Sequence, residues 1–383
     1  MRTLTFLLLI ASFTIGQTRA DDRIQDDFEN LMALMRADDG EQLSEDAAKA
    51  RATRFRTDLF AFVGEWQPKA GALVEGRFVL GRACALAGKP ADAIPHFRAF
   101  IEKNPESPDV EEATISLGTA YLDSRDWGNA ARVLSSLLAS GSDSERKAVV
   151  QYYLAIAQHQ QGALKESIAL LDTVASSGDE SPLVADASIK AIEFLRDAGR
   201  VTEAGERLTR LKSAHGDSRY LEMLEEQLGW LGKPAPELNG VGRWLNGPPT
   251  SISAHNGKVL VVVFFADKYE PCQFELKALE GVSKQLSGGG ASIIGLTKFY
   301  RSLDKTPAEV QAKNLDAFLD KHGVTFPVGI AKDFSNLKAY GVRGIPHTVV
   351  IDKSGNIAYV KTGSSQRNQR ALADLVAAIR RAM

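Results

Sequence analysis

Apolar residues recur at an interval of 37 positions through the first half of this chain. One series consists of small residues: Ala93, Ala130, Ser167 and Ala204. The residue four positions after each of them is large and apolar: Phe97, Leu134, Leu171 and Leu208. Small residues let two helices approach, and large apolar residues fill the groove beside them. The interval therefore predicts four helical hairpins between residues 73 and 217.

Two further series keep this interval. One is apolar, at Leu80, Leu117, Leu154 and Ala191, and the other marks turns, at Gly88, Gly162 and Gly199. The first unit resembles the tetratricopeptide repeat (TPR), although its 37 residues exceed the usual length of about 34. The residues that carry this resemblance are Leu80, Gly81, Gly88, Ala93, Phe97 and Pro105. It implies a TPR-like array over residues 73–231, closed by a helix at Tyr220–Trp230, after capping helices in residues 21–72.

Strands and helices alternate in the second half of the chain. Apolar runs predict strands at 259–265, 291–297, 326–330, 347–352 and 356–362. The segments between and after them predict helices at 269–286, 307–322, 334–340 and 367–382. This alternation indicates an α/β domain over residues 232–383. The expected fold class is therefore multidomain, with an all-α helical repeat array followed by an α/β domain.

Several motifs in the second half resemble the TlpA/ResA-like thiol-disulfide oxidoreductases, bacterial extracytoplasmic members of the thioredoxin superfamily. The opening segment Leu231–Leu238 and the segments 322–328 and 340–348 follow the family pattern. The run Tyr269–Glu275 matches the variant Cys-Glu-Pro-Cys-x-x-Glu except at its first cysteine. The resemblance implies a thioredoxin-like fold over 232–383, with an edge hairpin within Gly229–Lys258, a segment that is otherwise partly linker.

The resemblance also implies functional positions. It makes Cys272 and Glu275 candidate catalytic residues and places Pro346 at the family's cis-proline. The implied substrate groove is lined by Lys268, Tyr269, Glu270, Pro271, Ile345, Pro346 and His347.

The replacement of one cysteine by Tyr269 changes the expected chemistry. In a complete motif the first cysteine attacks a substrate disulfide, and the second releases the product from the mixed disulfide. A phenol, with an ordinary pKa of about 10, forms no disulfide and does not ionise appreciably at neutral pH. The two-cysteine reaction cycle is therefore closed to this protein.

The remaining candidate residues each have a structural alternative. Cys272 is either a buried inert thiol or a reactive one, and the nearby carboxylates Glu270 and Glu275 oppose thiolate formation because they raise a thiol pKa. Glu275 is either the family's active-site carboxylate or a solvated helix residue. We expect Asp267 to cap the helix in a capping box with Glu270.

His347 raises the possibility of a Cys-His pair or a soft-metal site with Cys272. The more common role of a histidine at a strand start is lining a groove or a surface, so we predict no metal site and no cofactor. Cys84, the other cysteine of the chain, is expected to be a buried reduced thiol. A Cys84–Cys272 disulfide would require the repeats to dock on the active-site edge.

The first 20 residues have the pattern of a secretory signal, with Arg2, an apolar core over 4–15 and a cleavage site before Asp21. No later run predicts a membrane span. Removing Arg2 and Arg19 takes the formal charge from −2 to −4, which offers no basic surface for nucleic acid. We expect an exported protein, periplasmic or secreted, with a protein or peptide partner.

Two functions fit these observations. The first is a protein of thiol-disulfide oxidoreductase descent with a degenerate active site, which acts in extracytoplasmic redox homeostasis or as a redox-inactive binding protein that uses its TPR-like array. The alternative is a single-cysteine redox or peroxide-reacting protein in which Cys272 works with an external thiol. The peroxide branch is weakened because Tyr269 stands where a peroxidatic motif has threonine.

Overall fold

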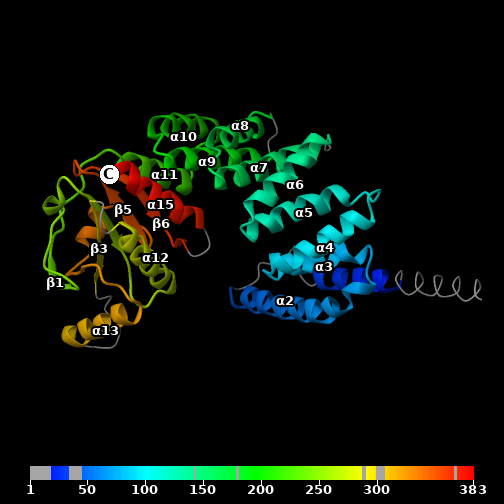
Figure 1. Ribbon diagram of the computed structural model, residues 1–383, viewed down its shortest axis with the longest axis horizontal. Coiled ribbons are helices and arrows are strands. Elements are labelled where there is room, and N and C mark those ends of the chain that lie inside the picture. The colour runs from blue at the N-terminus through cyan, green and yellow to red at the C-terminus, as the bar shows by residue number, and fades with distance from the viewer. Residues whose placement is uncertain are drawn as a thin grey trace, which may run out of the picture. The chain divides into compact units, whose positions relative to one another are not determined.

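The computed structural model describes residues 19–33, 45–141, 144–177, 181–286, 290–298, 307–365 and 369–383 (Figure 1). The expected signal segment lies outside the described residues apart from its last two, which begin a helix over 19–33. The chain divides into two compact units, Met1–Ala187 and Ser188–Met383. Because their relative placement is not determined, each unit is described by itself.

The regular elements in the described residues of the first unit are all helices. After the helix over 19–33 come α2 (Glu45–Trp66), η1 (Gln67–Ala72), α3 (Gly76–Leu86), α4 (Pro90–Lys103), α5 (Val110–Asp123), α6 (Trp127–Ala139), α7 (Ser144–Gln160) and α8 (Leu164–Ala175). Consecutive helices pack against each other as antiparallel hairpins. Helix α9 (Pro182–Asp197) spans the division between the two units. These helices confirm the helical repeat array that the 37-residue interval predicts.

Close packing inside the hairpins explains the recurring pairs of small and large residues. A Cβ atom added at Gly81 would lie 2.6 Å from the ring of Phe97, and one added at Gly118 would lie 2.6 Å from Leu134. Both large side chains are fully or almost fully buried. The glycine of one helix therefore makes room for the large residue of the next, and the same contact recurs one repeat later.

The turns within the hairpins share one backbone conformation. Four residues at 37-residue spacing have a positive φ: Gly88, Arg125, Gly162 and Gly199. After each of them, the next amide donates back to a carbonyl near the helix end, as Asp126 does to Tyr121 at 2.8 Å. This is the hydrogen-bond pattern of a Schellman cap. Arg125 fills the turn for which the sequence has no glycine, so the repeat keeps its geometry there without the usual residue.

The second unit combines the last helices with a six-stranded mixed sheet. Its helices after α9 are α10 (Val201–His215), α11 (Arg219–Trp230), η2 (Ser253–His255), α12 (Glu270–Leu286), α13 (Ala308–Lys321), α14 (Ser335–Ala339) and α15 (Gln369–Ala382). Its strands are β1 (Val241–Leu245), β2 (Val259–Phe264), β3 (Ala291–Lys298), β4 (Val328–Ala331), β5 (His347–Ile351) and β6 (Ile357–Thr362).

The strand order is β1-β4-β3-β2-β5-β6. Strand β3 runs parallel to β2 and β4, whereas the pairs β1–β4, β2–β5 and β5–β6 are antiparallel. The five strands and four helices expected after residue 258 are present, and their bounds differ from the predicted ones by at most two residues. The α/β thioredoxin-like fold expected for this part of the chain is confirmed.

Strand β2 is buried on both faces of the sheet. One face, with Val259, Val261 and Val263, packs with residues of α12, α13 and α15. The other face, with Leu260, Val262 and Phe264, packs with Tyr340 after α14 and, at its edge, with Trp230 and Leu231. Successive side chains of a strand point to opposite faces, so a wholly apolar strand requires a covering layer on each side.

The expected edge hairpin within Gly229–Lys258 is wrong. This segment contains one strand, β1, which pairs with β4. The residues before it bond to the β5–β6 turn instead, since the amide of Gly232 donates to Ile357 O at 2.8 Å and that of Ala235 to Gly355 O at 2.9 Å. Most of the segment is therefore held against the sheet and does not behave as a linker.

The end of α11 packs directly on the thioredoxin-like sheet. A Cβ atom at Gly341 would lie 2.8 Å from Nε1 of Trp230, and Arg343 forms an ion pair with Glu226 at 2.7 Å. The compact unit accordingly begins at Ser188, before the expected start of the thioredoxin-like domain at residue 232. The last helices of the array thus share a hydrophobic layer with the α/β part.

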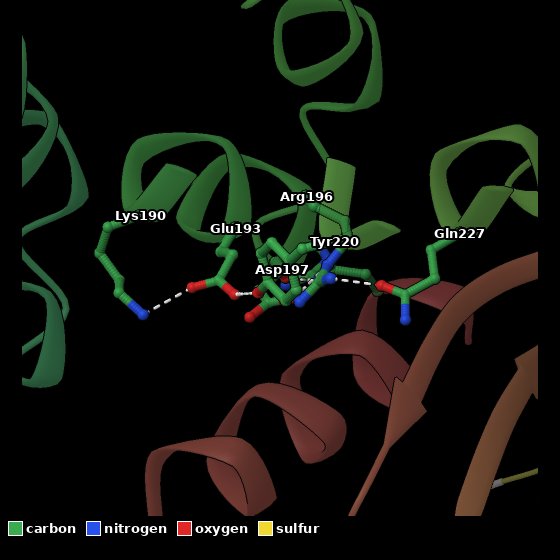
Figure 2. Close-up of polar contacts among 7 residues, drawn as sticks. Lys190, Glu193, Arg196, Asp197, Tyr220 and Gln227 are labelled. Carbon is green, nitrogen blue, oxygen red and sulfur yellow. Dashed lines mark hydrogen bonds and ion pairs between the residues drawn. The ribbon is translucent and has the colours of Figure 1, made fainter. Parts of the chain in front are cut away.

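A polar network connects these helices to each other (Figure 2). Arg196 binds the carboxylate of Asp197 at 2.8 Å and donates to Oε1 of Gln227 at 2.5 Å. Glu193 accepts from the hydroxyl of Tyr220 and pairs with Lys190. The network reaches α15, because Arg381 donates to the backbone carbonyl of Asp197 at 2.9 Å. Burial raises the pKa of Asp197, although the guanidinium of Arg196 opposes this effect.

We expect Arg196→Leu to lower the free energy of unfolding by about 2–3 kcal/mol, because it leaves the mostly buried Asp197 carboxylate and the Gln227 carbonyl without their donor. Arg200→Leu is the matched control. Its pair with Glu203 is half exposed, with side-chain exposures of 50% and 31%, so its loss should cost below about 1 kcal/mol. Urea unfolding of the full chain measures both values, and equal losses would contradict the stabilising role of the network.

Candidate functional site

The run from Tyr269 to Cys272 lies at the start of α12, after the turn that follows β2. The carbonyl of Tyr269 accepts from the amide of Cys272 at 2.9 Å and from that of Gln273 at 3.3 Å. Helix α12 therefore begins at Glu270, with Tyr269 as the residue that precedes it. This geometry puts Cys272 in the first helical turn, three residues after Tyr269.

The expected capping box of Asp267 and Glu270 is wrong. Asp267 lies two residues before the N-cap position, and its backbone carbonyl, at 3.2 Å from Nε2 of Gln273, is the atom that bonds to the helix. The chain between β2 and α12 is longer than the sequence pattern indicated. Backbone carbonyls of this turn therefore bond to the first turn of the helix.

Cys272 is a buried thiol. Its exposed fraction is 0%, and it packs with Val263, Phe265 and Leu276. Burial raises the pKa of Cys272 to about 11, the charge of Glu275 adds to the increase, and a hydrogen bond from the backbone at Ala266 opposes it. The thiolate, which is the nucleophilic form, is therefore strongly disfavoured at neutral pH. Of the two alternatives for this residue, the geometry favours the inert thiol.

The other residues of the expected groove differ in exposure. Lys268, Tyr269 and Glu270 are exposed, and 49% of Tyr269 is accessible. Ile345 is half-buried, Pro346 is buried and the bond between them is cis, as the family pattern predicts. A shared groove for these residues stays a prediction.

Glu275 is fully buried, so its interpretation as a solvated helix carboxylate is wrong. Its Oε1 accepts from Nζ of Lys361 at 2.8 Å, and its Oε2 accepts from the backbone amide of Ser365 at 2.8 Å. Lys361 also donates to the carbonyl of Gly363 at 2.7 Å. The carboxylate therefore has a buried cationic partner and a backbone donor. In this arrangement it ties α12 to the end of β6.

His347 and Cys272 lie on opposite faces of the sheet. His347 pairs with Phe264 across β2 and β5, and their rings are 6.0 Å apart. Phe264 belongs to the face away from Cys272. Nδ1 of His347 lies 2.9 Å from Oγ1 of Thr362. Burial lowers the pKa of His347 to about 4, and the charge of Lys361 adds to this decrease. A Cys-His pair is therefore not formed, and the imidazole is neutral at pH 7.

Cys84 lies in the first unit, as a free and fully buried thiol on α3. Its Sγ is 3.4 Å from Oε1 of Gln67, and burial raises its pKa to about 11. The prediction of a buried reduced thiol is confirmed. Within the described parts of the chain, no three or more His, Cys, Asp or Glu side chains converge into a metal-binding group.

Two residues of the site were missed by the sequence reasoning, Lys361 and Ser365. Ser365 reaches Glu275 through its backbone amide, which no side-chain pattern reveals. Lys361 had a usable signal, since it follows the buried Tyr359 by two positions and therefore points to the same face of β6. A lysine on a buried face requires a carboxylate partner.

Comparison with known proteins identifies both parts of the chain. Residues 231–360 match the model of the AhpC/TSA family, and residues 115–182 match that of the tetratricopeptide repeat. The C-terminal part is thus a thioredoxin-like redoxin domain related to thiol-disulfide oxidoreductases, and tetratricopeptide repeats precede it.

Individual relatives match about a third of this chain. Thioredoxin-like protein YneN of Bacillus subtilis is 28% identical over 138 residues, which cover 36% of this chain and 75% of YneN. Thiol-disulfide oxidoreductase ResA of Halalkalibacterium halodurans is 27% identical over 126 residues, or 33% of this chain and 66% of ResA. Protein DipZ of Mycobacterium bovis is 27% identical over 139 residues, or 35% of this chain, and the match spans only 19% of DipZ.

Alkylation tests the state of Cys272. In a Cys84→Ser variant, we expect the native protein at pH 7 to react with iodoacetamide at least about 100-fold more slowly than the urea-unfolded protein. Because the Cys272 pKa of about 11 lies above the pH range tested, the alkylation rate of the native protein should rise about tenfold per pH unit between pH 7 and 9. The unfolded rate should level off near the ordinary thiol pKa of about 8.5. Mass spectrometry follows the alkylation. Equal alkylation rates for the native and the unfolded protein would show that the Cys272 thiol is accessible.

The buried ion pair gives a second test. Lys361→Met should lower the free energy of unfolding by about 3–5 kcal/mol, because it leaves the Glu275 carboxylate buried without its cation. The double variant Glu275→Gln/Lys361→Met should be more stable than this single variant, since a neutral amide oxygen still accepts from Ser365. If chemical denaturation shows that the losses of the single variants Lys361→Met and Glu275→Gln add up to the loss of the double variant, the pair is not coupled.

Proposed function

We propose that this protein is an exported binding protein of thiol-disulfide oxidoreductase descent, in which disulfide exchange by two cysteines is lost. The tetratricopeptide repeats bind a protein or peptide partner, and the exposed face at Tyr269 contributes to the contact. The degenerate redoxin domain serves as a redox-inactive platform in the periplasm or outside the cell.

The observation that carries this proposal is the state of the two motif positions. The attacking position holds a half-exposed phenol at Tyr269, and the resolving position holds a buried thiol whose pKa is raised to about 11. The only other cysteine is also buried and free, so it offers no accessible partner thiol. A disulfide cycle needs a thiolate that can attack and a second thiol that can resolve, and the described side chains supply neither.

Export rests on the first 20 residues, with Arg2, an apolar core and Ala20 before the expected cleavage site. In the described parts of the chain, no helix is both long and apolar enough to cross a membrane. Partner binding rests on the repeats, whose stacked hairpins are an architecture that presents extended binding surfaces.

The single-cysteine alternative is less well supported by the same residues. Reaction with a peroxide or a mixed disulfide starts from an accessible thiolate, and Cys272 has no exposed surface. Glu275 and the aliphatic side chains around the sulfur both work against ionisation. Alkylation of Cys272 at the rate of an unfolded thiol would revive this alternative.

Restoring the missing cysteine tests the proposal. Wild-type protein should not catalyse the dithiothreitol-driven reduction of a model disulfide protein such as insulin. Tyr269→Cys should gain measurable activity, because it places a thiol at the start of α12, one helical turn from Cys272 and near the N-terminal end of the helix dipole. Quantitative turbidity measurements follow the reaction.

Two controls make the result specific. Tyr269→Ser should stay inactive, since it removes the phenol without adding a thiol, and Tyr269→Cys/Cys272→Ser should lose the gained activity. If folded Tyr269→Cys protein forms no disulfide between positions 269 and 272 under oxidising conditions, the motif assignment is wrong. Insulin reduction by the wild-type protein would show that the protein catalyses disulfide reduction without a cysteine at position 269, which would contradict the proposal.

A further inference from the structure

A pocket of about 210 Å³ lies within the second unit, between α11 and the strands next to the cis-proline. From α11 it is lined by residues that include Arg219, Met223 and Trp230, and from the α/β part by residues that include Tyr340, His347 and Thr362. It opens on the face of the sheet opposite to Cys272, because His347 belongs to that face. The pocket is therefore separate from the thiol site.

The polar groups that line this pocket include the imidazole of His347. The side chain is 3% exposed, and its Nε2 is a buried atom without a hydrogen-bond partner. Its Nδ1 is already engaged with Thr362 at 2.9 Å. Leaving a buried polar atom unpaired is unfavourable, so a ligand that bonds to Nε2 gains an interaction that the protein alone does not make.

Two arginine side chains line the pocket. Arg219 is exposed and forms no ion pair in the described part of the chain, although it lines the pocket. Arg343, also in the lining, is paired with Glu226 at 2.7 Å and is therefore already balanced. The side chains of Arg219, Arg343 and Glu226 together carry a net positive formal charge. An arginine without a partner favours a carboxylate, which it can bind with two parallel hydrogen bonds.

Apolar side chains form the walls between these polar ends. Met223, Trp230, Tyr340 and Val360 all line the pocket. An engineered cavity of about 150 Å³ holds a benzene ring, so a volume of about 210 Å³ accommodates one ring with small substituents. Thioether and aromatic surfaces are suitable partners for such a ring.

We propose that this pocket binds a small monocyclic carboxylic acid that carries a hydroxyl group, with the carboxylate at Arg219 and the hydroxyl at Nε2 of His347. The hydroxyl suits either tautomer, because it can donate to or accept from the imidazole. The polar network of α9 supports the site, since Arg196 fixes Gln227, another residue of the lining (Figure 2). The proposal does not depend on the redox state of Cys272.

Isothermal titration of the full chain with 4-hydroxybenzoate tests this proposal. For a ligand of this size we expect a dissociation constant between about 0.1 and 1 mM. Benzoate, which lacks the hydroxyl, and phenol, which lacks the carboxylate, should each bind about tenfold more weakly. No binding of 4-hydroxybenzoate at concentrations up to about 10 mM would overturn the proposal.

Variants separate the two contacts. Arg219→Gln should weaken 4-hydroxybenzoate about tenfold and leave phenol unchanged, whereas His347→Phe should weaken 4-hydroxybenzoate and leave benzoate unchanged. Arg243→Gln, an exposed arginine on β1 away from the pocket lining, is the charge-matched control and should have no effect. Unchanged binding in Arg219→Gln, a variant of a surface residue, would overturn the assignment even if His347→Phe fails to fold. Tighter binding of a short peptide that ends in tyrosine would overturn the assignment to a small free acid.

Discussion

The central strand β2 is apolar at every position, and this one constraint organises the second unit. A strand buried on both faces needs a covering layer on each side, because uncovered apolar surface costs about 25 cal/mol per Å². Helices α12, α13 and α15 cover one face. The other face is completed in part by Trp230 and Leu231 at the end of α11. The final helix of the array is therefore joined to the sheet by hydrophobic burial, and the polar network around Arg196 gives this junction a fixed geometry.

The same two-sided burial separates the chemistry of the domain into two places. Cys272 lies under one layer with the Glu275–Lys361 pair, and His347 lies under the other. The first place has a buried thiol whose pKa is raised to about 11, and the second has an imidazole with an unused nitrogen beside a pocket. A histidine next to a cis-proline and a cysteine in the expected motif thus remain apart, although both lie at the same end of β2.

Fold and activity depend differently on the residue at position 269. The side chain of Tyr269 is half exposed, and the backbone bonds of the turn come from its carbonyl, which every residue type provides. The thioredoxin-like fold therefore does not need a cysteine at this position, whereas a two-cysteine cycle does. Glu275 shows the reverse relation. Its burial with Lys361 makes it a structural requirement of the domain, whatever chemistry the domain performs.

The sequence by itself determined the order of strands and helices, the repeat interval and the single cysteine of the run from Tyr269 to Cys272, because these depend on local periodicity and on single positions. Long-range pairing belongs to the tertiary structure, since sheet order and register bring distant residues together. Only this level decided that Lys361 is the partner of Glu275, that His347 faces away from Cys272, and that Gly229–Lys258 is held against the sheet. Arg125 shows the limit most directly. Its left-handed turn is set by the hydrogen bonds of the helix end, and residue type alone does not reveal it.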